Sequence, residues 1–136
     1  MTDNEIAYSI VDRIEWELGT IELRSDNILQ FYPYEHVTGI SLEELKIMLV
    51  HLKEITKGEP RPYFSHNINL TEPLSTNAKL FIGKHCHEFA TAFAISEKHP
   101  ITRFMAHSIM YLHKPSIPMK LFKTEERAFD WLKSSF

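Results

Sequence analysis

The spacing of hydrophobic residues changes along the chain and distinguishes strand-like segments from helix-like ones. Ile21 and Leu23 alternate with polar neighbours, and a Ser-Asp-Asn turn separates them from a second hydrophobic run at 28–32. Alternation on both sides of a turn predicts a β-hairpin. The hydrophobic run at 6–11 is compatible with an additional edge strand or with an extended arm, so residues 1–16 are interpreted as an N-terminal extension or extra strand.

The segment 41–58 carries the clearest helical signals in the chain. Ser41 and Glu44 have the spacing of a capping box, and Gly58 lies where a helix commonly stops. Leucine recurs on one helical face, at positions 42, 45, 49 and 52. This spacing predicts an amphipathic helix over the segment.

The rest of the chain alternates between the two kinds of pattern. Strands are predicted at 63–70, 90–95 and 119–122, and helices at 75–82, 100–112 and 125–136. The full order is β-β-α-β-α-β-α-β-α. Because strands that alternate with helices need crossover connections, we expect an α/β fold with a mainly parallel five-stranded sheet and one antiparallel edge strand. Residues 17–136 are predicted to form a single domain.

The helix that begins at Pro100 is rich in methionine and aromatic residues. Its predicted core face consists of Phe104, Met105, Ile109 and Leu112, which leaves Met110 and Tyr111 as an apolar excess. If that excess is exposed, a homodimer interface is the simplest explanation, since symmetric dimers are the commonest oligomers.

Composition and charge narrow the classes of function. The chain has 136 residues, 43% of them hydrophobic, with only four glycines and a formal net charge of −3. Such a composition forms a core, and it offers no cationic surface for a phosphate backbone, so no nucleic-acid partner is expected. No hydrophobic run is long enough for a membrane span and the N-terminus does not read as a signal peptide, so we expect a cytoplasmic protein. A protein partner or a small molecule is the expected ligand.

Residues 90–132 contain a series of short motifs, in the stretch ATAFAISEKHPITRFMAHSIMYLHKPSIPMKLFKTEERAFDWL. An apolar strand is followed by a Ser and a Pro that open a helix, by a KP-x-IP link and by an LF-x-T-x-E-x-A-x-x-WL ending. In these motifs the chain resembles a group of uncharacterised bacterial proteins with a SpoIIAA-like fold, the fold of anti-sigma-factor antagonists and STAS domains. The similarity extends over most of residues 17–136. It implies a SpoIIAA-like domain that acts as a non-enzymatic module.

The resemblance also points to the start of the helix predicted at 75–82. In anti-sigma-factor antagonists, a regulatory phosphorylated serine lies at the start of the helix after the third strand, in the sequence Asp-Ser-Ser-Gly. The stretch PLSTNAK places Ser75 or Thr76 at the matching position, although Asn77 and Ala78 replace the second serine and the glycine. Ser75 or Thr76 is therefore a candidate phospho-acceptor, or simply a helix cap.

Polar residues follow the predicted parallel strands at their carboxyl ends, where sheets of this class bind ligands. The candidate ligand rim consists of His36, His66, Asn67, Ser96 and His99. These residues suit a polar small ligand, and histidines and glutamates at the same rim could hold a metal or act as an acid–base pair. Because ligation requires three or four side chains to meet at one point, we assign no metal, no cofactor and no catalytic residue.

The stretch GKHCHEF places the single cysteine of the chain, Cys86, between two histidines. Consecutive helical residues point about 100° apart, so His85, Cys86 and His87 do not share one metal ion if the segment is helical. Cys86 shares a helical face with Ile82 and Phe89, which predicts a buried, unreactive thiol at a helix end.

Taken together, these patterns predict a non-enzymatic binding or regulatory module of the STAS-like type, acting on a protein partner and forming a homodimer. The alternative is a small-ligand or lipid-binding protein that uses the strand-end rim or a pocket beneath the methionine-rich helix. A metal-dependent enzyme is the third hypothesis. No catalytic sequence motif occurs in the chain.

Overall fold

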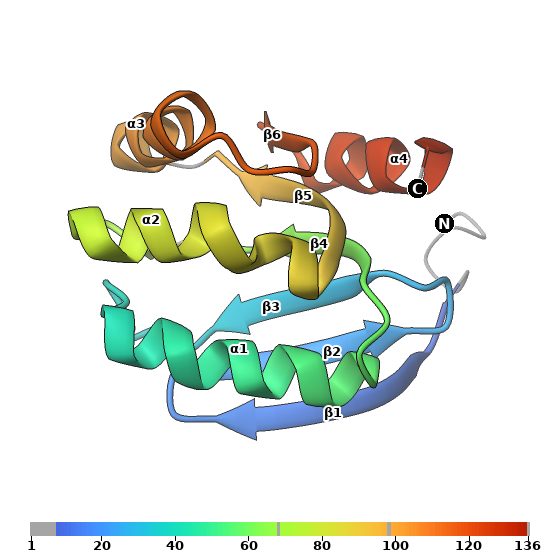
Figure 1. Ribbon diagram of the computed structural model, residues 1–136. Coiled ribbons are helices and arrows are strands. Elements are labelled where there is room, and N and C mark those ends of the chain that lie inside the picture. The colour runs from blue at the N-terminus through green and yellow to red at the C-terminus, as the bar shows by residue number, and fades with distance from the viewer. Residues whose placement is uncertain (1–7, 68, 98, 136) are drawn as a thin grey trace.

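The computed structural model describes residues 8–67, 69–97 and 99–135. Within these ranges, six strands form one sheet in chain order: β1 Ile10–Trp16, β2 Gly19–Arg24, β3 Leu29–Pro33, β4 Arg61–Ser65, β5 Ala90–Ser96 and β6 Met119–Phe122. The helices are α1 Leu42–Thr56, α2 Thr76–His85, α3 Pro100–Ser108 and α4 Glu125–Ser135 (Figure 1). A 3-10 turn, η2 at Cys86–Glu88, follows α2, and a π-helical turn, η3 at Ile109–His113, follows α3.

The α/β fold with a mainly parallel sheet is confirmed, and the strand count is corrected. β3 to β6 are parallel to one another, whereas β2 is antiparallel to both β1 and β3. The pattern predicts five strands with the antiparallel one at the edge, but β1 occupies the edge and β2 lies one position inside. Ile14 and Trp16 explain the sixth strand, because they lie two residues apart and pack on the same core. Residues 1–7 of the predicted extension lie outside the described residues.

The helices divide unequally between the two faces of the sheet. α1, α2 and α3 connect successive parallel strands of a sheet that grows in one direction, so right-handed crossovers place all three on the same face. Their side chains share a core with residues of β2 to β5. α4 follows the last strand and packs on the other face, where Ala128 and Leu132 contact Phe64, Ala92 and Ala94.

The predicted capping box of α1 is present. Ser41 Oγ accepts a hydrogen bond from Glu44 N at 3.1 Å, and the Glu44 carboxylate accepts one from Ser41 N at 2.9 Å. The helix ends at Thr56, after which Lys57 and Gly58 both adopt positive φ. These contacts and the positive φ angles define where α1 begins and ends.

The predicted core face of α3 is partly wrong. Phe104 and Leu112 are exposed, at 64% and 71%, and Tyr111 is 73% exposed. The residues that α3 buries are Thr102, Met105 and Ala106, followed by Ile109 in η3. These four residues follow helical spacing. Thr102 is polar and Ala106 is small, so a prediction based on large hydrophobic residues does not assign them to the core.

Candidate functional site

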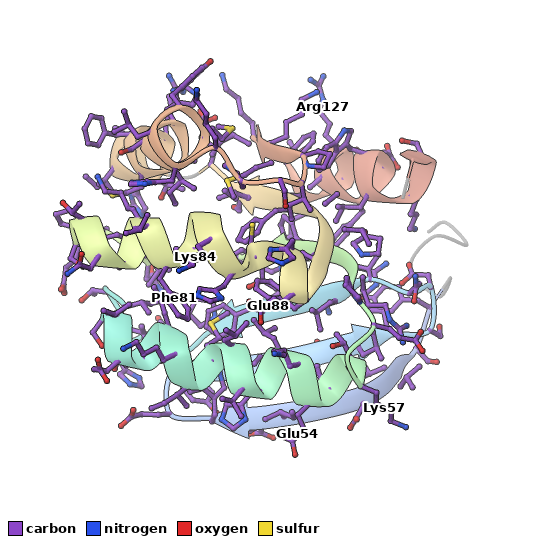
Figure 2. The ribbon with its side chains drawn as sticks, in the orientation of Figure 1. Glu54, Lys57, Phe81, Lys84, Glu88 and Arg127 are labelled. Carbon is purple, nitrogen blue, oxygen red and sulfur yellow. The ribbon has the colours of Figure 1, made fainter. Side chains whose placement is uncertain are left out.

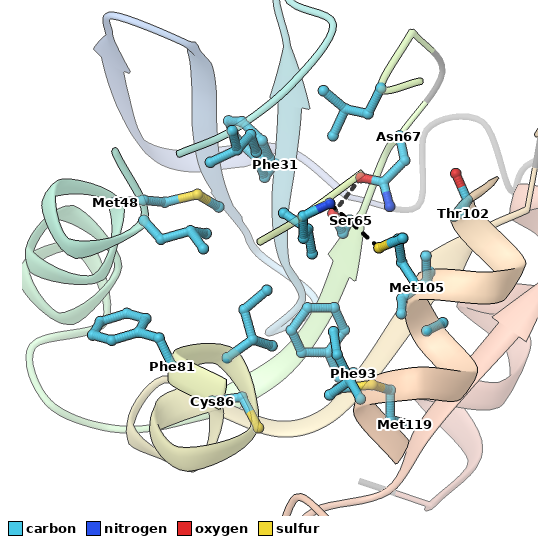
Figure 3. A pocket seen from close by; sticks show the side chains of 18 of the residues that line it. Phe31, Met48, Ser65, Asn67, Phe81, Cys86, Phe93, Thr102, Met105 and Met119 are labelled. Carbon is cyan, nitrogen blue, oxygen red and sulfur yellow. Dashed lines mark hydrogen bonds between the residues drawn. The ribbon is translucent and has the colours of Figure 1, made fainter. Parts of the chain in front are cut away.

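An apolar pocket of about 130 Å³ lies between the three helices α1, α2 and α3 and the sheet strands beneath them. Alternate residues of the central strands point into it, among them Phe31 of β3, Tyr63 of β4 and Phe93 of β5. The helices contribute Met48, Phe81 and Met105, and β6 contributes Met119 (Figure 3). Leucine, isoleucine, phenylalanine and methionine side chains therefore make up most of a wall that can accept an apolar molecule.

One end of the pocket is polar and lies near the carboxyl end of β4. Ser65 and Thr102 line it and are 8% and 6% exposed, and Asn67 lies beside them. Ser65 Oγ donates a hydrogen bond to Asn67 Oδ1 at 2.9 Å. Figure 3 shows these three side chains on the opposite side of the pocket from Phe81 and Cys86. We call Ser65, Asn67 and Thr102 the polar end.

The opposite end of the pocket contains a charged contact between α1 and the end of α2. His85 lines the pocket, and its Nδ1 lies 2.5 Å from Glu88 Oε2. Lys53 of α1 donates to Glu88 Oε1 at 3.0 Å, so Glu88 bridges the two helices. Figure 2 labels Glu88 between α2 and α1. Hydrogen bonds from His85 and then Lys53 lower the pKa of the Glu88 carboxyl below its usual value.

Cys86 is buried in the pocket wall, as its helical position predicts. It is 1% exposed and forms the C-cap of α2. Burial raises the pKa of its thiol to about 11, so the thiol is protonated at neutral pH. Burial also raises the pKa of the Tyr63 phenol in the same wall, which keeps that group neutral as well.

The predicted rim residues do not gather at one point. Asn67 lines the pocket, whereas the neighbouring His66 lies on the other side of the sheet. His66 is 1% exposed, stacks on Tyr32 at 3.6 Å between ring centroids, and has its Nδ1 3.2 Å from Glu125 Oε2 of α4. β4 ends at Ser65, and the alternation of its side chains between the two faces continues through His66 and Asn67.

The other three rim residues occupy separate places. His36 is exposed in the loop after β3, where it stacks on Tyr34. Ser96 is buried at the end of β5, and His99 is the N-cap of α3. Among the described residues, no group of three His, Cys, Asp or Glu side chains is placed to hold a metal ion.

Ser75 is the N-cap of α2, and Thr76 is the first residue of that helix. Ser75 Oγ accepts a hydrogen bond from Ala78 N at 3.0 Å, and both Ser75 and Thr76 are exposed. The cap role is thus visible in the hydrogen bonding, and phosphorylation of either residue stays a prediction.

Sequence reasoning missed most of the pocket. Of its polar end, only Asn67 belonged to the predicted rim. Thr102 gave one usable signal, because it lies three residues before Met105 and seven before Ile109 on a helical face. The contribution of Met48 and Phe81 depends on how α1 and α2 pack together, which no local pattern specifies.

Comparisons with known proteins identify a family and a fold. Residues 21–135 match the domain of unknown function DUF7793, and the chain belongs to that family. No curated protein matches the chain. A crystal structure of an uncharacterised DUF3478-family protein with a SpoIIAA-like fold, from Shewanella loihica PV-4, superposes with a TM-score of 0.53. The alignment covers 92% of this chain and 93% of that chain at 18% identity, which establishes the SpoIIAA-like fold alone.

Proposed function

We propose that this member of the DUF7793 family is a STAS-like, non-enzymatic binding module that takes up a small apolar molecule in the pocket beneath α1, α2 and α3. The observation that carries the proposal is the pocket itself, with its wall of aromatic, aliphatic and methionine side chains. Apolar side chains offer water few hydrogen bonds, so a molecule with an apolar surface gains free energy on entering such a space. A cytoplasmic location is part of this proposal. Within the described ranges, no helix has the length and apolar character needed to cross a bilayer.

The size of the pocket limits the ligand. Drug-sized molecules occupy pockets of about 300–1,000 Å³. An apolar cavity of about 150 Å³ in another protein holds benzene. The pocket here, at about 130 Å³, therefore suits a single ring or a short alkyl chain in this conformation, rather than a long acyl chain.

The titratable groups in the wall support binding rather than chemistry. The Cys86 thiol and the Tyr63 phenol both have raised pKa values and stay protonated at neutral pH. His85 is held by Glu88. Such groups suit a wall that excludes water and contributes contact area.

Isothermal titration calorimetry with toluene tests the proposal, because toluene presents an apolar ring of suitable size. The matched variants are Ala106→Leu and His107→Leu, which place a leucine on neighbouring residues of α3. Ala106 is 2% exposed and lines the pocket, whereas His107 is exposed. We expect the wild type and His107→Leu to bind toluene and Ala106→Leu to lose binding. Absence of toluene binding to the wild type would contradict the proposal.

A second candidate function is self-association through the exposed apolar residues of α3 and η3. Phe104, Tyr111 and Leu112 are each more than half exposed, and a symmetric dimer would cover them. Sedimentation velocity over a range of concentrations tests this role. We expect a dimer that Phe104→Glu disrupts, and a wild type that stays monomeric at high concentration would count against it. The same exposed residues would also suit the binding of a different protein.

The regulatory part of the proposal concerns Ser75 or Thr76. A phosphate on either residue would lie at the start of α2, near unpaired backbone N–H groups. Because α2 forms one wall of the pocket, the modification would couple to ligand binding. Mass spectrometry of the protein purified from its native host tests this, and an unmodified peptide across Ser75 in every growth condition would argue against it.

A further inference from the structure

The two edges of the sheet differ in how well they are protected against pairing with another strand. Within the described residues, β2 is the one strand that pairs with β1, so the other side of Ile10–Trp16 is a free edge. A free edge can add a strand from another chain. At the opposite edge, β6 has four residues, directly follows Pro118 and carries the exposed Lys120, all of which discourage pairing.

The register of β1 against β2 shows which residues present their backbone groups to the free edge. Trp16 and Gly19 close the two-residue turn between the strands, so their backbone groups point at each other. Gly19 is paired with Pro33 on its other side, and Pro33 has no N–H to offer it. Because backbone groups alternate along an antiparallel strand, the N–H and C=O groups of Arg13 and Glu15 point to the free edge.

The charged residues of β1 select one way in which two copies can pair. Copies related by a two-fold axis pair antiparallel around one residue of the strand. Of the axis positions at 12–15, those at Asp12, Arg13 and Glu15 each set a charge opposite the same charge of the second copy, which is destabilising. An axis at Ile14 instead sets Arg13 opposite Glu15 twice. Arg13 also contacts Glu22 of its own chain but stays 52% exposed, so it can reach a second carboxylate.

The same register joins apolar residues on the helix-covered face. Ile14 and Trp16 pack on the core and are only partly buried. The His51 ring of α1 lies 5.5 Å from the Trp16 ring, and Ile47, one turn earlier on the same side of α1, is 47% exposed. A two-fold axis perpendicular to the sheet keeps both α1 helices on one face. Ile14 and Ile47 of each copy would therefore lie beside the same residues of the other copy.

We propose that the free edge of β1 binds β1 of a second copy, antiparallel and centred on Ile14, so that the sheets of two chains join into one. The β-bulge at Val11 interrupts the ladder, so regular pairing extends over residues 12–16. This surface is separate from α3, which lies near the opposite edge of the sheet (Figure 1). The proposal goes beyond the apolar pocket and does not depend on it.

A cysteine at the axis tests the register directly. Two residues directly opposite each other in an antiparallel pair have Cβ atoms about 4.5–5.5 Å apart, close enough for a disulfide after a small shift. We expect Ile14→Cys to form a covalent dimer when diamide is added as oxidant. Glu15→Cys is the matched control, because its two thiols would lie two residues out of register and should not join. Cys86 is buried, and the wild type is the blank.

A charge change tests the pairing of Arg13 with Glu15. Glu15→Arg, added to Ile14→Cys, should slow the cross-link by about tenfold or more, because two opposite-charge pairs become like-charge pairs. Glu59→Arg is the matched control in an exposed loop before β4 and should have no effect. Phe104→Glu should also leave the cross-link in place.

The outcomes separate this edge from the surface of α3. Equal cross-linking of Ile14→Cys and Glu15→Cys, or no effect of Glu15→Arg, overturns the proposal. Loss of the cross-link with Phe104→Glu would assign self-association to α3 and also overturn it. Sedimentation velocity is a readout that leaves Ile14 intact. Glu15→Arg alone should lower the sedimentation coefficient at a given concentration and Glu59→Arg should not, and equal coefficients for these variants and the wild type would contradict the pairing.

Discussion

The two faces of the sheet are built from the same strands but are filled in different ways. Beneath α1, α2 and α3 the side chains are apolar and leave a pocket of about 130 Å³. On the other face, the apolar contact with α4 covers β4 and β5, and a paired polar network covers β2 and β3. The first face therefore carries an almost uncharged pocket, whereas the second combines a packed apolar contact with a charged network.

The polar network of the second face consists of Arg13, Glu22, Arg24, Asp26 and Gln30. Glu22 accepts hydrogen bonds from Arg13 and Gln30, at 3.0 and 2.9 Å, and Arg24 makes a two-point contact with Asp26 at 2.9 and 2.6 Å. The Arg24 guanidinium also lies over the rings of Tyr8 and Phe129. The groups of this network satisfy one another, whereas the pocket on the helix-covered face has a mostly apolar wall.

The largest expected effect is at Arg24, which is 3% exposed. Arg24→Ala removes a buried guanidinium that pairs with the partly buried Asp26 and packs on the ring of Phe129, so we expect a loss of about 3–5 kcal/mol in the free energy of unfolding. Urea denaturation measures the loss. Arg127→Ala, on the exposed side of α4, is the control and should change stability by less than about 0.5 kcal/mol. A similar result for the two variants would mean that the second face is not tightly filled.

The next effect compares truncation on the two faces. Leu132 on α4 is 0% exposed in a packed environment, so Leu132→Ala should lower the free energy of unfolding by about 3–4 kcal/mol. Met48 on α1 is 6% exposed but borders the pocket and already lacks neighbours on one side, so Met48→Ala should cost about 2 kcal/mol. Thermal and urea denaturation report both values. A larger loss at Met48 than at Leu132 would contradict the contrast between the faces.

A pH-dependent effect is expected at Cys86 in the pocket wall. Burial raises the pKa of its thiol from an ordinary value near 9 to about 11. The folded state therefore holds this proton more tightly than the unfolded state, so the stabilisation is complete below pH 9 and is lost as the pH rises toward 11. Urea denaturation between pH 8 and 11 should show a steeper fall in the wild type than in Cys86→Ala. If the free energy of unfolding falls equally with pH in the two proteins, burial does not raise the pKa of the Cys86 thiol.

The smallest effect is expected at Glu88, which joins α1 to α2 at the charged end of the pocket. Its lowered pKa means that the stabilisation is present above the usual carboxyl pKa and is lost as the pH falls through the lower, folded value. Because Glu88 is partly exposed, Glu88→Gln should cost about 0.5 kcal/mol at pH 7. The difference from the wild type should shrink toward pH 3. Glu17→Gln, at an exposed turn, is the control, and an equal effect there would remove any role for the bridge.

Local sequence signals predicted the elements of the fold better than they predicted the site. Ser41, Glu44 and Gly58 form the capping box and the stop of α1 through contacts with residues close in sequence. The start and end of α1 can therefore be predicted from the sequence. The hydrophobic run at 6–11 is compatible with an edge strand or an extended arm, whereas β1 starts at Ile10 and its core-facing residues are Ile14 and Trp16. The order of elements predicted only a mainly parallel α/β sheet, and the SpoIIAA-like fold was implied by the family resemblance of the motifs at 90–132.

The pocket could not be predicted in the same way, because it depends on tertiary packing. Phe104 and Leu112 look like core residues by size, but α3 turns Thr102 and Ala106 toward the sheet instead. His66 and Asn67 are neighbours in sequence but point to different faces of the sheet. The predicted rim, which grouped residues by their position after a strand, therefore included residues from both faces. Only the packing of α1, α2 and α3 over β3 to β5 reveals which residues share the space.

Methionine methyl resonances offer the most direct test of a ligand pocket on the helix-covered face. Met48, Met105 and Met119 line the pocket, while Met110 packs on the core outside it. In protein labelled with 13C at the methionine methyl groups, titration with toluene should shift the first three signals in a saturable manner and leave Met110 nearly unchanged. Unchanged spectra at millimolar toluene, or shifts confined to Met110, would contradict the account.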